Sequence, residues 1–512
     1  MLLNRFKAFL NNYFKGTLNN LFVNFKNFSS NNRKYLKNYN IESNFTKNDI
    51  WIFDSSSNLN KISLFSAFTY LLSNELKNKN LKFSTLICAS GPGYCQVGAS
   101  PKNPNNPMPC KTCIETNLNL FNESDKILFK KSDKEIEHNN IDNKIKNLTQ
   151  SSKKWIAREN KNLEIVKRIE NNLNDAASKW INFLNEIGTN NFPKVAVIFN
   201  GYSFPESIVK NYLEQYGVQI FTFESGYLEN SVYVSEMYAP EYLFDFNYRN
   251  LDTSESEKLD NYMNRRYSGN FKRGSVDFWK NINPVDAELV NLFNKFEKLI
   301  SVFLNVPYDT SQTNASQLFL NIYEWIYYLE TLIKSNLNVC FVFRSHPDEV
   351  RTDKKTNFEI SKYLQNKGFE NYSNVVIIKS NSPVNSYELI SNSDLVLTYN
   401  STITLEAVYL GTNAISAGFA HFCRLNYFEL ANNKSEYKQK VQHCLENTKV
   451  DRQAFDTISS YLYQMIFESA IDLSSNVKFI KKYEYQIIDK NILDAKFTEF
   501  TNKLENIVRT ND

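Results

Sequence analysis

The chain has 512 residues, of which 42% are hydrophobic and 22% are charged, and its formal net charge is +4. This length is sufficient for two domains with separate cores. The small net charge excludes a nucleic-acid binder that relies on bulk electrostatics, and no apolar run is long enough to cross a bilayer. The N-terminus lacks an apolar core followed by a cleavage site, and an odd count of seven cysteines is typical of a reducing compartment. We therefore expect a cytoplasmic protein.

Residues 1–47 predict a basic amphipathic helix. Apolar side chains recur at three- and four-residue steps from Leu3 to Phe28, and no acidic residue occurs before Glu42. Such a helix can lie on an anionic membrane surface, which predicts peripheral attachment to the inner face of the cytoplasmic membrane. Docking on the protein's own core is the alternative, and Gly16 weakens both interpretations.

The segment 48–245 predicts a first α/β domain, because strand patterns alternate with helix patterns. A helix is expected at 62–76, and the polar, charge-mixed stretch 122–188 is typical of inserted, solvated helices. The expected strands are 49–54, 83–88, 195–199 and 218–223.

A second α/β series occupies 297–425, after a segment at 246–296 that is rich in Asn, Asp, Ser and Lys and predicts a linker. Its expected strands are 299–306, 339–344, 375–379, 394–398 and 413–416, with a helix around 318–334. Strands that alternate with helices pair in parallel, so the two series predict two doubly wound, Rossmann-like domains that face a cleft. Residues 426–512 predict C-terminal helices.

Two strand ends of the second series carry residues suited to a phosphate. Arg344 and His346 end one strand, and Pro347 fixes the backbone so that the imidazole can point into the cleft. A turn of small polar residues ends another strand and opens a helix, whose free N–H groups favour an anion. This turn and helix carry Asn400, Ser401, Thr402 and Glu406.

Each of these residues also has a structural interpretation. A single histidine is often a packing residue, the polar turn can be a simple helix cap, and Glu406 can belong to a capping box or a solvated face. The pairing of two such strand ends in one α/β unit favours a nucleotide site. Glu406 would then accept hydrogen bonds from ribose hydroxyls, and Glu388 on the preceding helix is a weaker candidate.

Five segments, in this order along the chain, resemble the capsule polysaccharide biosynthesis glycosyltransferases. They are Phe199–Tyr202, Phe223–Gly226, Phe343–Glu349, Ser386–Ile390 and Tyr399–Glu406. The best-known members of that family transfer a sugar acid from a CMP-activated donor onto a growing surface glycan. The resemblance covers about 190–425 and implies a GT-B fold, with terminal helices that cross back onto the first domain. Tyr202 stands where the family usually has an arginine.

Transfer to a hydroxyl acceptor requires a base that removes the acceptor's proton while the donor's bond to phosphate breaks. In a GT-B arrangement this base comes from the N-terminal domain. Glu224 is the candidate because it ends a strand and precedes a turn at Gly226, and Glu206 is the reserve. Asn200, Gly201 and Gly226 are expected to line the same cleft. No Asp-x-Asp motif sits at a strand end, so we expect transfer without a required metal or other cofactor.

Four cysteines, Cys88, Cys95, Cys110 and Cys113, lie in a Gly- and Pro-rich loop with the spacing C-x6-C-x14-C-x2-C. Four thiolates can hold zinc or an iron-sulfur cluster, and a structural site of this kind is one prediction. A redox or disulfide pair and unconnected cysteines are the alternatives. Cys340, Cys423 and Cys444 are scattered and are expected to be packing residues.

The sequence thus predicts a GT-B glycosyltransferase with a nucleotide-sugar donor and a glycan or glycolipid acceptor, working with polysaccharide assembly or export machinery. His421 lies after the donor motif and can contact the donor or be structural. The donor base, the sugar, the acceptor and inversion or retention stay open. A CDP-polyol phosphotransferase of the teichoic-acid type and a non-catalytic nucleotide-binding scaffold are the alternative functions.

Overall fold

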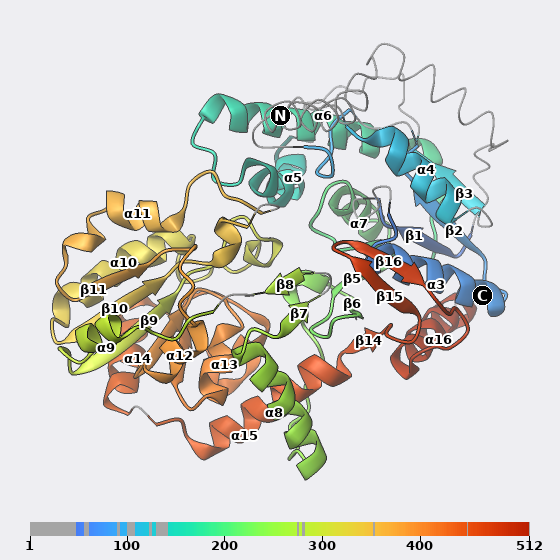
Figure 1. Cartoon of the computed structure of the whole chain (residues 1–512). Coiled ribbons are helices and arrows are strands. Elements are labelled where there is room, and N and C mark those ends of the chain that lie inside the picture. The colour runs from blue at the N-terminus through green and yellow to red at the C-terminus, as the bar shows by residue number, and fades with distance from the viewer. Residues whose placement is uncertain are drawn as a thin grey trace, which may run out of the picture.

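The structure is a computed structural model, and it describes residues 48–55, 61–89, 93–99, 108–121, 125–129, 142–273, 276–278, 282–351, 354–447 and 449–510. The basic segment predicted at 1–47 lies outside these residues. None of the helices in the described ranges is both long and apolar enough to span a membrane. Figure 1 shows two lobes, each built around one sheet.

The N-terminal lobe contains a seven-stranded sheet in the described chain, with the order β14-β6-β5-β4-β1-β2-β3. Its parallel part consists of β1 (Ile50–Phe53), β2 (Phe83–Ile87), β3 (Asp125–Leu128), β4 (Val195–Phe199) and β5 (Gln219–Ser225). β6 (Ser231–Ser235) and β14 (Ala470–Asp472) extend one edge in antiparallel pairing. β1 lies at the centre of the parallel part, in which Ile50 pairs with Phe83 on one side and Val195 on the other.

The C-terminal lobe contains a five-stranded parallel sheet with the order β11-β10-β9-β12-β13. The strands are β9 (Lys298–Phe303), β10 (Val339–Arg344), β11 (Val375–Ile378), β12 (Leu395–Thr398) and β13 (Asn413–Ser416). In both sheets the first strand lies at the centre of the parallel strands, and the later strands are added first on one side of it and then on the other. This arrangement is doubly wound, so the predicted pair of Rossmann-like domains is confirmed.

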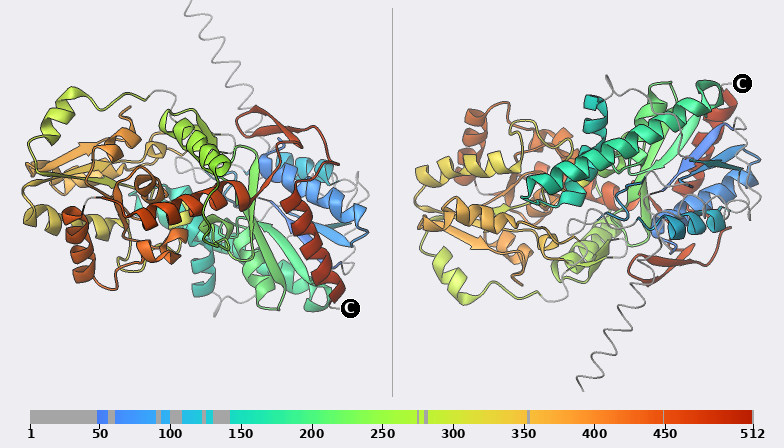
Figure 2. Two further views of the ribbon diagram at one scale, coloured as in Figure 1. Left: turned by 90° about the horizontal axis from the view of Figure 1, so that it is seen from below. Right: turned by 90° about the horizontal axis from the view of Figure 1, so that it is seen from above.

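Helices cover the faces of both sheets (Figures 1 and 2). Those of the N-terminal lobe are α3 (Leu64–Asn78), α4 (Cys110–Leu120), α5 (Asp142–Ala157), α6 (Leu163–Ile187) and α7 (Glu206–Glu214). α8 (Thr253–Tyr267), the strand pair β7 (Phe271–Arg273) and β8 (Val276–Phe278), and α9 (Ala287–Phe293) follow. The C-terminal lobe contains α10 (Ile322–Ser335), α11 (Ile360–Asn366), α12 (Ser386–Ser391), α13 (Ile403–Tyr409) and α14 (Lys434–Glu446).

Two polar segments pack more tightly than their composition predicts. The insertion at 122–188 contains α5 and α6, and α6 is amphipathic rather than solvated all round. Its buried Trp180 packs against Phe53 and Phe129, with ring centroids 5.3 and 4.2 Å apart. The segment 246–296, predicted as a linker, holds α8, whose buried face includes Tyr262 and Met263. An Asp252–Glu255 capping box starts α8, which explains a helix in so polar a stretch.

The C-terminal tail returns to the N-terminal lobe, as the family resemblance implies, and it does so with strands as well as helices. α15 (Arg452–Tyr463) runs beneath both lobes, and β14 then pairs with β6 (Figure 2). The hairpin of β15 (Val477–Lys481) and β16 (Glu484–Ile487) and the helix α16 (Ala495–Thr510) follow. One apolar cluster contains Tyr233 of the first lobe, Val342 and Leu405 of the second, and Leu462 of α15. The two lobes therefore share part of their core.

We predict that α16 stabilises the N-terminal lobe through Phe497, which is fully buried and packs against Phe68 at a ring distance of 5.7 Å. Phe497→Ala should lower the free energy of unfolding by about 3–5 kcal/mol, because it removes a buried aromatic ring and leaves a cavity. Urea unfolding would measure this, with Ile492→Ala at a 58% exposed position as the control. Equal unfolding midpoints for the two variants would contradict the prediction.

Candidate functional site

The site is built at the carboxyl edge of the C-terminal sheet, between β9 and β12. The order of strands reverses at this point, and the loops that follow these two strands diverge to opposite faces of the sheet. Open α/β sheets bind their ligands in the crevice formed there. The loop after β9 contains residues 309–315, and the loop after β12 begins at Asn400.

Loop 309–315 is fixed by side chains and close backbone contacts. Gln312 Nε2 donates to Asn400 Oδ1, and Asn400 Nδ2 donates to the Ser311 carbonyl at 2.9 Å. The Ala315 carbonyl accepts from the Phe419 amide at 2.8 Å. Sequence reasoning placed Asn400 here but missed the loop itself. The sequence feature that could have indicated this loop is the polar run at 309–315, which follows the first strand of the second α/β series.

His346 follows β10 at the same edge, and its tautomer is set by the backbone. Its Nδ1 accepts a hydrogen bond from the Asp348 amide at 3.1 Å, so the ring proton resides on Nε2. Burial lowers the pKa of the imidazole, which Asp348 opposes. His346 is therefore a neutral donor at pH 7, with Nε2–H as the group that can meet a ligand oxygen.

Lys354 and Arg351 place positive charge near His346, and both side chains form ion pairs with aspartates. Lys354 Nζ lies 3.4 Å from both Asp309 and Asp348, and Arg351 Nη1 lies 2.8 Å from Asp348. Burial alone would lower the pKa of Lys354, but the two carboxylates outweigh it and raise the pKa. Lys354 thus stays charged beside His346, where it can support a negatively charged ligand.

A cavity lies between loop 309–315 and α5 of the other lobe. The C-terminal lobe contributes Tyr308, Asp309, Gln312 and Thr313, and α5 contributes Asn147, Gln150, Ser151 and Lys154. Burial lowers the pKa of Lys154. Amides, hydroxyls and an amine thus line a cavity between the two lobes, as a polar ligand requires.

The N-terminal lobe presents the loop 200–204 and the end of β5. Asn200 adopts a φ of 57°, and its Oδ1 accepts from the amides of Tyr202 and Ser203 at 3.0 and 3.1 Å. Its Nδ2 donates to Glu224 Oε2 at 2.6 Å, and the Ser225 amide donates to Glu224 Oε1 at 2.9 Å. Asn200 therefore shapes the loop and orients the Glu224 carboxylate, which is half-buried.

The two lobes meet where loop 200–204 contacts loop 309–315. Asn314 Nδ2 donates to the Tyr202 hydroxyl at 2.6 Å and to Glu241 Oε1 at 2.5 Å, and the Tyr202 hydroxyl itself donates to Glu241. The Tyr202 ring stacks on Tyr238 with centroids 4.0 Å apart. Burial and Glu241 raise the pKa of Tyr202, so the hydroxyl stays protonated. Tyr202 thus joins the lobes beside the candidate base.

Arg344 and Glu406 are engaged within the protein. The buried Arg344 guanidinium donates to the carbonyls of Lys379 and Ser382 at 2.6 and 3.0 Å, and burial lowers its pKa to about 10. The buried Glu406 accepts from Arg266 Nη2 and from the Tyr387 hydroxyl, each at 2.7 Å. These contacts give Arg344 the role of fixing the β11–α12 connection and Glu406 the role of fixing α8. Their predicted ligand contacts stay predictions.

The remaining glycine, histidine and glutamate candidates also make structural contacts. A Cβ on Gly226 would lie 2.2 Å from Ser231 Oγ and 2.9 Å from Ala470 Cβ, so glycine permits β14 to approach. The buried His421 shares a 2.8 Å hydrogen bond with the Tyr461 hydroxyl. Glu388 accepts from the Val285 amide at 2.8 Å, and the reserve base Glu206 is fully buried.

Ser401 and Thr402 open α13 at the carboxyl end of β12, and both are half-buried. Ser401 Oγ accepts from the Ile403 amide at 3.3 Å, whereas Thr402 makes no side-chain capping bond. In the N-terminal lobe, Gly201 has a φ of 88° and packs closely against Thr222 of β5. The structure thus brings His346, Asn400, Asn200 and Glu224 to facing loops of the two lobes.

Within the described parts of the chain, no three or more His, Cys, Asp or Glu side chains are arranged to hold a metal ion. The four cysteines of the loop 88–113 nevertheless line one cavity, at the carboxyl edge of the N-terminal sheet. This cavity is separate from the one between the lobes, since the two share no lining residue.

No protein-family model and no curated protein matches the chain. Among solved structures, it is similar to KpsC of Thermosulfurimonas dismutans, a beta Kdo 2,4 transferase, at 10% identity and a TM-score of 0.36, over 62% of this chain and 87% of that one. A second KpsC from the same organism, a beta Kdo 2,7 transferase, is 14% identical with a TM-score of 0.35, over 64% of this chain and 89% of that one. The UDP-GlcNAc 2-epimerase of Methanocaldococcus jannaschii, in complex with UDP-GlcNAc and UDP, is 12% identical with a TM-score of 0.28. That similarity covers 81% of this chain and 98% of the epimerase.

Kdo transferases are thus among the solved structures that this chain is similar to. At these identities, and with TM-scores below 0.5, the likeness by itself assigns no activity. The fold class rests instead on the strand orders of the two sheets.

We predict that Arg266 and Glu406 act mainly on stability. Arg266→Met should lower the free energy of unfolding by about 3–5 kcal/mol, because it leaves the Glu406 carboxylate buried without its cation. Arg452→Met, at an exposed pair with Asp456, should cost less than about 1 kcal/mol. Urea unfolding of both variants would measure this. Similar losses for the two would show that the buried pair has no special role.

We also predict that His346 is neutral, with its proton on Nε2, at pH 7. Its pKa should lie below the ordinary value of about 6.5, because burial disfavours the imidazolium. The unfolded state then binds the proton more readily, so this residue's contribution to stability is lost as the pH falls below about 6.5. Nitrogen-15 NMR of the histidine rings would report both the tautomer and the titration. A proton on Nδ1 at pH 7 would contradict the assignment.

Proposed function

We propose that the protein is a glycosyltransferase that moves a sugar from a nucleotide-activated donor to a hydroxyl of a surface glycan or glycolipid. The observation that carries the proposal is the meeting of two doubly wound lobes at a polar cavity beside the β9/β12 crevice. His346 lies at the carboxyl edge that bounds this crevice, and Glu224 ends a strand of the facing lobe.

The donor's phosphates would lie at this edge of the C-terminal sheet. His346 Nε2–H would donate to a phosphate oxygen, and the paired Lys354 would add positive charge. Asn400, Ser401 and Thr402 border the same crevice and would supply further hydrogen-bond donors. A neutral donor suits this role, because it stabilises the charge that develops on the leaving phosphate without needing protonation first.

Glu224 would act as the general base. The acceptor oxygen forms a bond to the anomeric carbon, its proton passes to the Glu224 carboxylate, and the bond between that carbon and the phosphate oxygen breaks. The electron pair of the broken bond leaves with the phosphate. Asn200 Nδ2 and the Ser225 amide hold the carboxylate at 2.6 and 2.9 Å, which supports a defined orientation for proton removal.

We expect a CMP-activated sugar acid as the donor class, because the motifs around His346 and Asn400 resemble capsule enzymes that use such donors. We further propose that the protein acts at the inner face of the cytoplasmic membrane with polysaccharide assembly or export machinery. The basic composition of residues 1–47 supports that location. The proposal requires no metal or other cofactor for the transfer step.

Thermal unfolding with CMP, CDP, UDP, GDP and their sugars would identify the donor, because a ligand that binds only the folded state raises the melting temperature. His346→Ala should abolish the shift, whereas Glu224→Gln should retain it and lower transfer at least about 10²-fold. His443→Ala, at an exposed position on α14, is the matched control.

Three outcomes would count against the proposal. The absence of a shift with any nucleotide would favour the scaffold interpretation. A CDP-specific shift with dependence on a glycerol or ribitol phosphate acceptor would favour a polyol phosphotransferase. Undiminished transfer by Glu224→Gln would remove the assigned base.

A further inference from the structure

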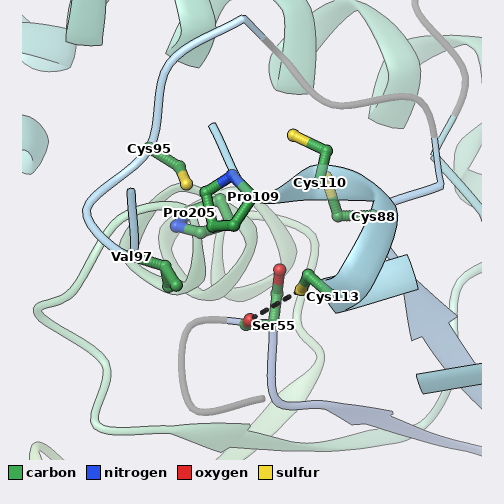
Figure 3. A pocket seen from close by; sticks show the side chains of 8 residues that line it. All are labelled: Ser55, Cys88, Cys95, Val97, Pro109, Cys110, Cys113 and Pro205. Carbon is green, nitrogen blue, oxygen red and sulfur yellow. Dashed lines mark hydrogen bonds between the residues drawn. The ribbon is translucent and has the colours of Figure 1, made fainter. Parts of the chain in front are cut away.

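Four cysteine side chains line one small cavity of the N-terminal lobe. Cys88, Cys95, Cys110 and Cys113 line it together with Ser55, Val97, Pro109 and Pro205 (Figure 3). They come from the end of β2, from a loop and from the first turns of α4. Cysteines that are 25 residues apart in sequence are therefore neighbours around one space, which the sequence spacing alone does not require.

The cavity occupies the ligand-binding position of its own sheet. β1 and β4 are the neighbours at which the N-terminal strand order reverses, and Ser55 and Pro205 follow these two strands. Cys88 directly follows β2. The crevice that in other doubly wound sheets receives a ligand is thus bordered here by thiols.

We propose that Cys88, Cys95, Cys110 and Cys113 ligate a metal centre, as a zinc ion or an iron-sulfur cluster. Both take four thiolates, and Cys-x-x-Cys on one element is a common half-site. The thiols surround the cavity without converging on the position of one ion. Zinc would need them to turn inward, whereas a cluster spans a wider space because each cysteine binds a different iron.

This centre would hold in place the part of the N-terminal lobe that borders the cavity between the lobes. Ser152 Oγ donates to Oε1 of Gln96, the residue next to Cys95, at 2.6 Å. Ser152 Oγ also accepts a hydrogen bond from the Phe204 amide at 2.8 Å. Ser152 belongs to α5, whose neighbouring Ser151 lines that cavity. Fixing the loop at Cys95 therefore fixes both α5 and loop 200–204. The centre is a positioning element and takes no part in the transfer step.

The test is the metal content of the full-length protein purified without oxygen. Elemental analysis, acid-labile sulfide and the visible spectrum should show either about one zinc per chain or iron with sulfide, and either result supports the centre. Cys113→Ser should lose most of the metal, whereas Cys444→Ser, on α14 outside the cluster, should retain it. A chain that holds neither metal nor sulfide overturns the proposal, provided that reconstitution also fails.

Reconstitution keeps the test decisive if Cys113→Ser does not fold. Wild-type protein stripped of metal should bind one equivalent of Co²⁺ with thiolate charge-transfer absorption, or should rebuild a cluster from iron and sulfide. The four thiols should become unreactive toward a disulfide reagent in the loaded protein, while the other three cysteines keep their reactivity. If the reactivity of the four thiols were the same in the metal-free and the loaded protein, ligation would be refuted. None of these readouts depends on transferase activity, so the proposed function is tested separately.

Discussion

The loop that leaves β9 is the constraint on which the candidate site depends. Residues 309–315 must satisfy three sets of partners at once: Asn400 after β12, the Phe419 amide after β13, and Tyr202 and Glu241 of the opposite lobe. The approach is so close that a Cβ on Gly418 would lie 2.7 Å from the Ala315 carbonyl and 2.9 Å from the Tyr399 carbonyl. A side chain there would displace the loop and with it one wall of the cavity.

The relation between the two lobes follows from two further contacts on opposite sides. On one side, the Asn357 amide and side chain donate to the carbonyls of Arg158 and Ala157 at the end of α5, at 2.8 and 2.9 Å. On the other side, an apolar cluster joins residues of both lobes with α15. The α5 contact consists mainly of hydrogen bonds, with one ring contact between Trp155 and Tyr308, whereas the α15 contact is apolar. Opening of the cavity would therefore break the polar contacts first and pivot about the apolar cluster.

Much of the fold could be predicted because parallel strands are continuous apolar runs. Val339–Arg344 and Asn413–Ser416 were predicted to the residue, since both are almost wholly buried by helices on either face. β14 was missed because a three-residue edge strand has no pattern of its own and exists only through its pairing with β6, more than two hundred residues away. α8 was missed because capping, rather than apolar periodicity, defines its start.

The candidate site was less predictable because similar residue types serve structure and chemistry. Arg344 and His346 stand two residues apart at one strand end, yet the first donates to backbone carbonyls and the second accepts from the Asp348 amide through Nδ1, which leaves its proton on Nε2. Strand alternation places residues two apart on the same face, so it does not separate them, and their partners at Lys379 and Asp348 decide their roles. Glu406 lies next to a predicted phosphate turn, and its cation Arg266 comes from a segment predicted as a linker. Partners at such sequence separation leave no local signal.

The two sheets use the same architectural position for different chemistry. At the C-terminal crevice, amides, hydroxyls, Lys154 and the Asp309 carboxylate line a polar cavity, as a polar ligand that must enter and leave requires. At the N-terminal crevice, four half-buried thiols line a small cavity, which suits the proposed metal centre. The hydrogen bonds through Ser152 connect the two positions. A metal centre that stays bound in the N-terminal crevice would keep α5 and loop 200–204 in place. Only the C-terminal lobe would then have to adapt to its ligand.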